Sequence, residues 1–255
     1  MLFSLPSPNS FTKPPIIGIT TSCKSETGHY CLFSNYIDAV RRAGGVPVLL
    51  TPGELHLARI LDFVDGLLFS GGGDIDPSEY GGSCHSSIYR INAERDAFEL
   101  GLASLALKAN IPLLGICRGL EIFTVVSGGR LISHIPDEFG EAIIHRADQS
   151  HGVEHAVQII PRTRLSTLLH HKTEVKVVSW HHQAAEAAPT GWRVAAQAPD
   201  GVIEAIEHQH HPWAIAVQWH PELAPDDLLQ QRIFRAFVQA ASQRQVVAIA
   251  QPASN

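Results

Sequence analysis

Short apolar runs alternate with helical patterns through the first half of the chain, and this alternation limits the fold more than any other feature. The apolar runs fall at residues 15–20, 46–50, 66–70 and 111–116. The helical patterns fall at residues 35–43, 55–63 and 93–108, and another helix is expected directly after Cys117. Because strand, helix and next strand in this order form a crossover unit, we expect a parallel sheet in this half.

The second half of the chain differs, because strand-like runs follow one another with fewer helices between them. These runs fall at residues 153–160, 174–179, 192–198, 202–207 and 213–219, and a last helix is expected at 226–240. Strands without crossover helices favour antiparallel pairing. We therefore predict an α/β fold of the flavodoxin-like type, with a central, mostly parallel sheet, helices on both faces and a mixed or antiparallel extension.

Length and composition favour a single globular domain. The chain has 255 residues, 45% of them hydrophobic, and neither a long linker nor an internal repeat divides it. We place the domain at residues 15–243, between loose tails at 1–14 and 244–255. The net charge of −6 and the lack of any Lys/Arg stripe argue against nucleic-acid binding. The lack of an apolar stretch of about 20 residues argues against a membrane span.

The four cysteines form no paired pattern, and the first residues lack the charged start and apolar core of a signal peptide. We therefore expect reduced thiols and a cytoplasmic protein. The oligomeric state is left open by the sequence, with a homodimer as one option.

One cysteine stands between an expected strand and an expected helix, with glycines two positions to either side. The segment Gly115-Ile116-Cys117-Arg118-Gly119 has the spacing of a nucleophile elbow, a tight turn that pushes a reactive side chain out at the carboxyl edge of a sheet. The positive end of the following helix favours thiolate over thiol. An ordinary buried cysteine in a glycine-containing turn explains the same pattern, so the turn alone does not decide the chemistry.

A histidine and a glutamate follow the last expected strand as His220-Pro221-Glu222. In an extended chain, residues two apart point the same way, so Glu222 can hold one ring nitrogen of His220 while the other faces a thiol. This is the third-group arrangement that activates a nucleophilic cysteine. The alternative is an exposed strand end, since the chain has fifteen histidines.

Three consecutive glycines, Gly71, Gly72 and Gly73, follow the third expected strand. Attack of a thiolate on an amide creates a negative oxygen that needs preorganised donors. The glycine amides can supply one donor and the backbone N–H of Arg118 a second. A flexible turn is the alternative, whereas a phosphate loop is disfavoured because no Lys-Ser/Thr pair follows the glycines.

The motifs GICRG, QWHPE, SGGGDIDP and RDAFE occur here in one order along the chain. Together they resemble the class I glutamine amidotransferase-like superfamily, and within it the γ-glutamyl-γ-aminobutyrate hydrolase family, also described as peptidase C26. The resemblance covers about residues 15–241.

The resemblance implies a free-standing α/β hydrolase that cleaves γ-glutamyl amides such as γ-glutamyl-γ-aminobutyrate, in polyamine or γ-aminobutyrate breakdown. Cys117 would form a thioester, and His220 would protonate the leaving amine and then activate water. Gly72, Gly73 and Arg118 would bind the oxyanion. The resemblance also places three residues near the substrate, namely His181, His182 and Gln183.

Two positions depart from the usual pattern of the superfamily. Glutamine is common four residues after the nucleophile, where this chain has Glu121, and asparagine is common where it has Val178. We expect Glu121 to face the α-ammonium group of the substrate, with tuning of the thiolate or a packing role as the alternative. Both departures concern the choice of substrate and leave the hydrolytic chemistry intact.

Two other functions compete with a free-standing hydrolase. The first is a glutaminase subunit that supplies ammonia to a partner synthase, and the second is a non-catalytic binding module. The lack of a fused synthase domain favours the hydrolase. No cofactor or metal is expected, because the run from His208 to His211 is interpreted as a turn between strands and no Cys or carboxylate set completes a zinc site there.

Overall fold

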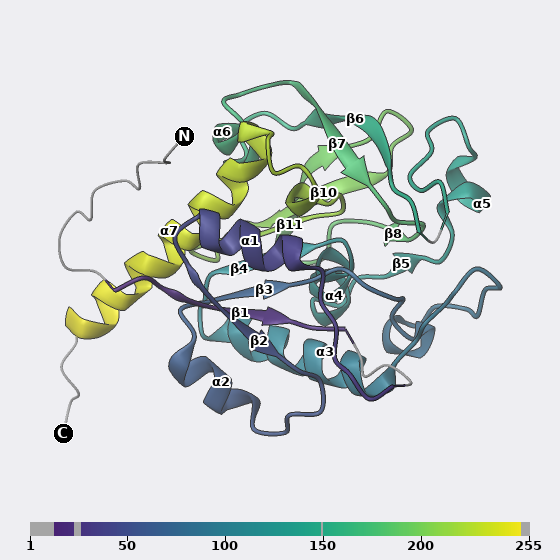
Figure 1. Cartoon of the computed structure of the whole chain (residues 1–255). Coiled ribbons are helices and arrows are strands. Elements are labelled where there is room, and N and C mark those ends of the chain that lie inside the picture. The colour runs from purple at the N-terminus through teal and green to yellow at the C-terminus, as the bar shows by residue number, and fades with distance from the viewer. Residues whose placement is uncertain (1–12, 23–26, 149, 251–255) are drawn as a thin grey trace.

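A computed structural model describes residues 13–22, 27–148 and 150–250. Most of the expected N-terminal tail therefore lies outside the described residues. The first half of the described chain contributes parallel strands and the second half mainly antiparallel ones (Figure 1).

A mixed sheet of nine strands runs through the described part of the chain, in the order β2-β1-β3-β4-β11-β10-β9-β6-β7. The five parallel strands are β1 (Ile16–Thr20), β2 (Val46–Leu50), β3 (Gly66–Phe69), β4 (Leu113–Ile116) and β11 (Ala214–Val217). The antiparallel extension contains β10 (Ile203–His208), β9 (Trp192–Gln197), β6 (Val153–Ile159) and β7 (Glu174–Ser179). The order of the parallel part, 2-1-3-4-5 when its strands are numbered alone, is that of flavodoxin-like folds.

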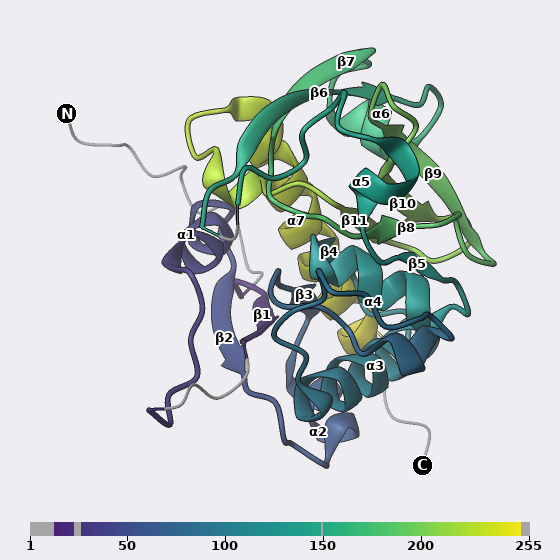
Figure 2. The same cartoon turned by 90° about the vertical axis from the view of Figure 1, so that its right-hand side faces the viewer.

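Helices cover both faces of the parallel part (Figure 2). One face carries α1 (Ser34–Arg42) and α7 (Leu228–Ala250), and α6 (Arg164–Leu168) packs beside α7 against β9 of the antiparallel extension. The other carries α2 (Leu57–Phe63), α3 (Ala93–Lys108) and α4 (Arg118–Val126). The shorter elements are β5 (Leu131–Ile132), β8 (Ala184–Ala185), α5 (Ile135–Phe139), η1 (Pro77–Tyr80) and η2 (Pro221–Leu223).

Neighbouring residues of the central strands enter different cores. Leu114 and Ile116 of β4 pack into the core with α1 and α7, whereas Leu113 packs into the core with α3 and α4. Burial on both faces explains why these strands read as continuous apolar runs. The structure thus confirms the predicted α/β class, the mostly parallel central sheet and the antiparallel extension.

Several local predictions were wrong or incomplete. Helix α1 begins at Ser34 and ends at Arg42, one residue earlier at each end than expected, and its capping position is Phe33, which has no side-chain oxygen. Helix α7 continues to Ala250, past residue 243, where the expected domain ends. That stretch contains no glycine or proline before Pro252, so nothing in it stops a helix. The short elements went unpredicted because two to five residues show no periodicity.

None of the described helices combines the length and the apolar character that crossing a bilayer requires.

The carboxyl ends of β1, β3, β4 and β11 meet at one edge of the sheet, because these strands are parallel neighbours. Ligands of open α/β sheets bind at this edge. The glycine loop follows β3, Cys117 follows β4, and His220 follows β11. The topology therefore assembles three distant stretches of sequence in one place.

Candidate active site

Cys117 occupies a strained turn between β4 and α4. Its backbone has φ 53° and ψ −106°, in the region of positive φ that residues other than glycine rarely adopt. The backbone N–H of Cys117 donates to the carbonyl oxygen of Val217 at 2.8 Å, which ties the turn to β11. Strain of this kind costs about 1–3 kcal/mol and persists where the surrounding structure enforces it.

The two glycines beside the turn are required by close backbone approaches. A Cβ atom on Gly119 would lie 2.4 Å from the carbonyl oxygen of Phe69, at the end of β3. A Cβ atom on Gly115 would lie 2.7 Å from the carbonyl carbon of Gly119. The spacing seen in the sequence therefore lets α4 start directly against the strands.

His220 and Glu222 form a buried pair shortly after β11, which ends at Val217. His220 Nδ1 lies 2.6 Å from Glu222 Oε1, and both residues are buried. The expected extended geometry was wrong, because Glu222 lies in the 3₁₀ turn η2, which begins at Pro221. The backbone N–H of His220 donates to the carbonyl oxygen of Val178 at 2.8 Å. This bond gives Val178 a backbone role that does not depend on its side chain.

Cys117 and His220 converge beside the glycine loop. A Cβ atom placed on Gly71 would lie 2.9 Å from His220 Cε1 and 3.5 Å from Cys117 Cβ. Burial lowers the pKa of His220, but the Glu222 carboxylate and Cys117 raise it well above its ordinary value. Burial raises the pKa of the Cys117 thiol, and His220 opposes this shift. Ionisation of the thiol therefore depends on the imidazolium that Glu222 stabilises.

The glycine loop turns its carbonyl groups toward two buried arginines. The carbonyl oxygen of Gly71 accepts from Arg95 Nη2 at 3.0 Å, and that of Gly73 accepts from Arg118 Nη1 at 2.9 Å. Neither Gly72 nor Gly73 donates its amide to another group in the described part of the chain. A Cβ atom on Gly72 would lie 2.0 Å from Arg95 Nη1, so any other residue there would displace the buried Arg95 guanidinium.

A buried charge network supports this loop and the start of α4. Arg118 Nε donates to Glu99 Oε2 at 2.7 Å, and Arg95 Nη2 donates to Glu99 Oε1 at 3.0 Å. Arg118 Nη2 also pairs with Asp96 Oδ1 at 2.5 Å. Burial raises the pKa of Glu99, but the two arginines outweigh it and hold the pKa below its ordinary value. Arg95 and Asp96, which stand in the RDAFE motif, thus belong to the scaffold of the site.

Tyr36 of α1 is a site residue that the sequence analysis missed. Its hydroxyl accepts a hydrogen bond from the Gly71 N–H at 3.0 Å and lies 3.5 Å from His220 Nδ1. Burial, followed by the Glu222 charge, raises the pKa of Tyr36 well above its ordinary value, so the hydroxyl stays neutral. No local motif marks Tyr36, because its role comes from the packing of α1 against the sheet edge.

A pocket of about 710 Å³ opens over Cys117 and His220. The predicted residues Gly72, Gly73 and Arg118 line it, and further walls come from Tyr89, Arg90 and Trp180. Four other predicted substrate-binding residues do not line this pocket: Glu121, His181, His182 and Gln183.

The last three of these residues are buried beside the pocket. His182 Nε2 lies 3.0 Å from Oδ2 of Asp74, the residue that directly follows the glycine loop. His181 Nδ1 lies 2.9 Å from the carbonyl oxygen of Gln183, and its Nε2 faces Glu204 at 3.4 Å. Only Trp180 of this element reaches the pocket, with its ring 6.0 Å from that of His220.

Glu121 is buried near Cys117 but does not line the pocket. Gln218 Nε2 donates to Glu121 Oε1 at 2.9 Å and also lies 3.9 Å from Cys117 Sγ. Burial, and then the Asp74 carboxylate, raise the pKa of Glu121 to about 7. Gln218 therefore links this carboxyl group to the candidate nucleophile.

The raised pKa of Glu121 predicts a pH-dependent loss of stability. The pKa of the Glu121 carboxyl in the folded state exceeds the ordinary 4.5. The protonated carboxyl therefore contributes fully to the free energy of unfolding below about pH 4.5, and this contribution is lost as pH rises through about 7. We expect Glu121→Gln to reduce the fall in unfolding free energy across this window by up to about 3 kcal/mol. Urea unfolding at stepped pH measures this, with the exposed Glu79→Gln as control. The same fall in both variants would contradict the prediction.

Comparison with known proteins places this fold and site among relatives. A family model described as peptidase C26 matches residues 15–222. The γ-glutamyl-γ-aminobutyrate hydrolase PuuD of Escherichia coli is 31% identical over 239 residues, which cover 89% of this chain and 93% of that protein. A candidate glutamine amidotransferase of Mycobacterium tuberculosis is 37% identical over 237 residues, which cover 89% of this chain and 75% of that protein.

A solved structure supports the fold alone. The crystal structure of a candidate GMP synthase subunit from Thermoplasma acidophilum has a TM-score of 0.66 and 18% sequence identity, and the match covers 94% of this chain and 100% of the other. The likeness shows that the two chains share one α/β fold.

The comparisons confirm the resemblance carried by the sequence motifs. The family match and the hydrolase named among the relatives support an enzyme that hydrolyses amides. Because the family match extends from just before β1 to Glu222 and so includes every motif of the candidate site, the chain belongs to the peptidase C26 family.

Proposed function

We propose that this protein hydrolyses γ-glutamyl amides of small amines through a thioester on Cys117. One observation carries the proposal: the strained Cys117 and the buried His220–Glu222 pair meet beside two glycine amides that have no other partner in the described chain. Each element that amide hydrolysis by a thiolate requires is then present at one sheet edge.

The geometry supports the following acylation step. His220 takes the proton of Cys117, and the sulfur forms a bond to the amide carbon. The amide oxygen becomes an oxyanion, which the Arg118 amide and a glycine amide stabilise. His220 then gives its proton to the amine nitrogen as the C–N bond breaks, which leaves a thioester and a free amine.

Deacylation repeats these roles with water. His220 takes a proton from water, whose oxygen forms a bond to the thioester carbon. The second oxyanion collapses, the C–S bond breaks, and His220 returns its proton to sulfur. Glu222 stabilises the imidazolium in both steps and does not itself take a proton.

The pocket suits a small substrate that carries a carboxylate. The exposed side chain of Arg90 lines the wall near Tyr89, and a guanidinium binds carboxylate well. A γ-glutamyl group supplies such a carboxylate, and the relative PuuD of Escherichia coli is named as a hydrolase of γ-glutamyl-γ-aminobutyrate. The proposed substrates are therefore γ-glutamyl amides of small amines, γ-glutamyl-γ-aminobutyrate among them. The proposed role of the enzyme is in the breakdown of such amines.

A second candidate function is a glutaminase subunit that passes ammonia to a synthase. The likeness to a candidate synthase subunit over 94% of the chain favours it. Free glutamine would then be the preferred substrate, and turnover would rise when the partner binds. A pull-down from the native host, followed by a glutaminase assay with and without the captured protein, separates the two functions.

A substrate panel tests the main proposal. The pure chain is incubated with γ-glutamyl-γ-aminobutyrate, other γ-glutamyl amines, γ-glutamyl peptides and free glutamine, and kcat/KM is ranked. We expect γ-glutamyl amines to rank first, with free glutamine well below them. Preference for glutamine would favour the glutaminase subunit, and no release of glutamate from any compound would contradict both functions.

Removing the charge of Glu222 tests the role of the carboxylate. Glu222→Gln should lower kcat/KM by about 100-fold, because the imidazolium loses its buried counter-charge. The pKa of His220 should fall, which shifts the acidic limb of the kcat/KM profile to lower pH. Stopped-flow acylation across pH measures both effects. A profile identical to that of the parent protein would remove Glu222 from the mechanism.

A further inference from the structure

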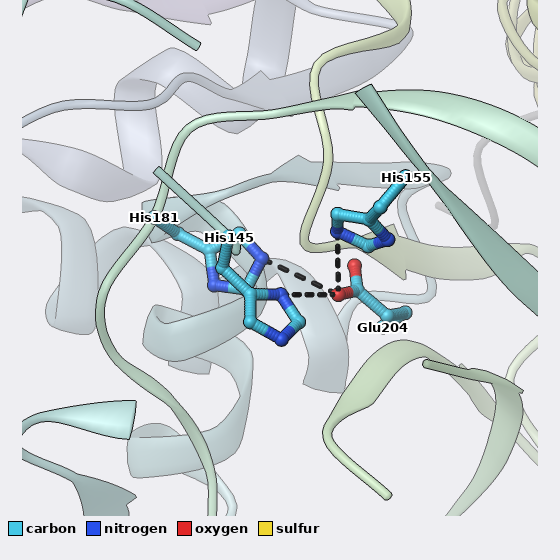
Figure 3. A group of neighbouring side chains, drawn as sticks. All are labelled: His145, His155, His181 and Glu204. Carbon is cyan, nitrogen blue, oxygen red and sulfur yellow. Dashed lines mark ion pairs between the residues drawn. The ribbon is translucent and has the colours of Figure 1, made fainter. Parts of the chain in front are cut away.

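Three histidines and one glutamate converge at a second place in the fold, outside the pocket over Cys117. His155 lies on β6 and Glu204 on β10, whereas His145 and His181 lie on the segments just before β6 and just after β7. Figure 3 shows the three imidazoles directed at the same carboxylate. Glu204 is fully buried, and the side chain of His155 is only 7% exposed.

The distances in this cluster match a small coordination shell. Glu204 Oε1 lies 3.1 Å from His145 Nδ1, 3.4 Å from His155 Nε2 and 3.4 Å from His181 Nε2. One ligand atom from each of the four residues lies within 4.8 Å of the other three. Ligands at about 2.0–2.1 Å around a tetrahedral zinc ion lie about 3.3 Å apart, close to the three distances to the carboxylate.

The outer nitrogen of each imidazole already has an acceptor. His145 Nε2 lies 2.9 Å from Asp200 Oδ2, and His181 Nδ1 lies 2.9 Å from the carbonyl oxygen of Gln183. His155 Nδ1 lies 3.1 Å from the carbonyl oxygen of Ala156. If these outer nitrogens carry the protons, the inner nitrogens present lone pairs. Metal-binding histidines are oriented in this way by outer acceptors.

The inner atoms face one another at ion-pair distances, with geometry that is poor for hydrogen bonds. The inner nitrogens of the three imidazoles and both Glu204 oxygens are buried without a hydrogen-bond partner in the described chain, despite their ion-pair distances. With the protons on the outer nitrogens, three lone pairs and a carboxylate face one centre and repel unless a cation, either a metal ion or a further proton, lies between them. Buried polar atoms of this kind call for a specific explanation.

We propose that His145, His155, His181 and Glu204 bind one divalent transition-metal ion, with zinc as the preferred ion. Three neutral imidazoles and one carboxylate suit zinc, and four protein ligands describe a closed, structural site with no position for substrate. The site lies outside the run from His208 to His211, where the sequence disfavours zinc.

The metal would fasten the segment between α5 and β6 to the sheet. His145 belongs to this segment, and the carbonyl oxygen of Asp148 accepts from Trp180 Nε1 at 3.1 Å. Ser150 of the same segment lines the pocket over Cys117. A second pocket of about 420 Å³, lined by His145 and His181, offers an entry path for the ion. Metal binding is therefore expected to order one wall of the candidate active site.

Metal content and spectroscopy test the site directly on the full chain. Protein purified without chelators and incubated with zinc should retain about one zinc ion per chain. Inductively coupled plasma mass spectrometry measures this metal content. Apoprotein prepared with a chelator and titrated with Co²⁺ should develop the strong visible bands of four-coordinate cobalt. Substoichiometric zinc together with the absence of these bands would overturn the proposal.

Variants locate the ion within the chain. Glu204→Gln should abolish stoichiometric zinc and the cobalt bands. Asp200→Asn, which changes the outer partner of His145 and keeps an oxygen for the Val202 N–H, should weaken zinc affinity by about 10- to 100-fold in chelator competition. His210→Ala, an exposed histidine of the neighbouring run, should bind zinc like the parent. Unchanged cobalt bands in Glu204→Gln would place the ion elsewhere and overturn the assignment.

The readouts do not depend on catalysis or on the Glu204 variant folding. The same titrations on Cys117→Ala should give parent-like zinc affinity, so failure of the proposed hydrolysis leaves the metal test intact. If Glu204→Gln does not fold, Asp200→Asn and the parent apoprotein still decide the question. Equal zinc affinity of Asp200→Asn and the parent would contradict a site that uses His145.

Discussion

Cys117→Ala should lower kcat for γ-glutamyl amide hydrolysis by about 10⁴-fold or more, because the other cysteine that lines the pocket, Cys31, does not stand in the strained turn between β4 and α4. Alanine keeps the Cβ atom and the positive φ of the turn, so the fold and the melting temperature should change little. The measurements are single-turnover release of the amine and covalent labelling by a glutamine-like electrophile, followed by mass spectrometry.

The matched control is Cys84→Ala, which removes an exposed thiol far along the chain from the elbow. It should retain parent kcat and remain labelled at Cys117. If Cys117→Ala turned over substrate like this control, Cys117 would not be the nucleophile, and the thioester mechanism would have to be abandoned.

Glu99→Gln should destabilise the fold by about 3–5 kcal/mol, because it leaves the buried Arg95 and Arg118 without a shared counter-charge. Glu99 is fully buried, so water cannot replace the lost carboxylate. Thr20 also donates to Glu99 Oε1 at 2.7 Å, which ties β1 into the same network. Urea unfolding gives the free energy, and kcat should fall as well, since both arginines hold the glycine loop.

The control for this change is Glu79→Gln, which removes an exposed carboxylate and should alter the unfolding free energy by less than about 0.5 kcal/mol. A loss below about 1 kcal/mol in Glu99→Gln would contradict the prediction. It would mean that Asp96 alone satisfies Arg118 and that the network is not essential to the glycine loop.

Periodicity and glycine spacing predicted the main elements because these signals are local. The apolar runs of β1, β3 and β4 matched buried strands, and the pattern at residues 93–108 matched α3. The elbow around Cys117 was visible because Gly115 and Gly119 are needed within a few residues of it. The short elements were missed, since packing rather than local preference sets them.

The site residues also divide into those that local motifs predicted and those that only tertiary packing placed. Cys117, His220 and Glu222 stand in short motifs, and their order along the chain was enough to nominate them together. Tyr36 reaches His220 only because α1 packs at the sheet edge, and no motif announces it. The element containing His181 and His182 was expected at the substrate, but the fold directs both side chains to buried carboxylates of other segments.

The sequence by itself determined where the longer strands form, where the backbone turns tightly at Cys117 and which side chains carry reactive groups, because each depends on neighbours a few positions away. The tertiary structure alone decided which distant groups meet. Parallel pairing of β3, β4 and β11 brought the glycine loop, Cys117 and His220 to one edge, and antiparallel pairing set His155 and Glu204 within reach of two loop histidines. The physical reason is that pairing and packing act between segments whose separation along the chain leaves no local pattern.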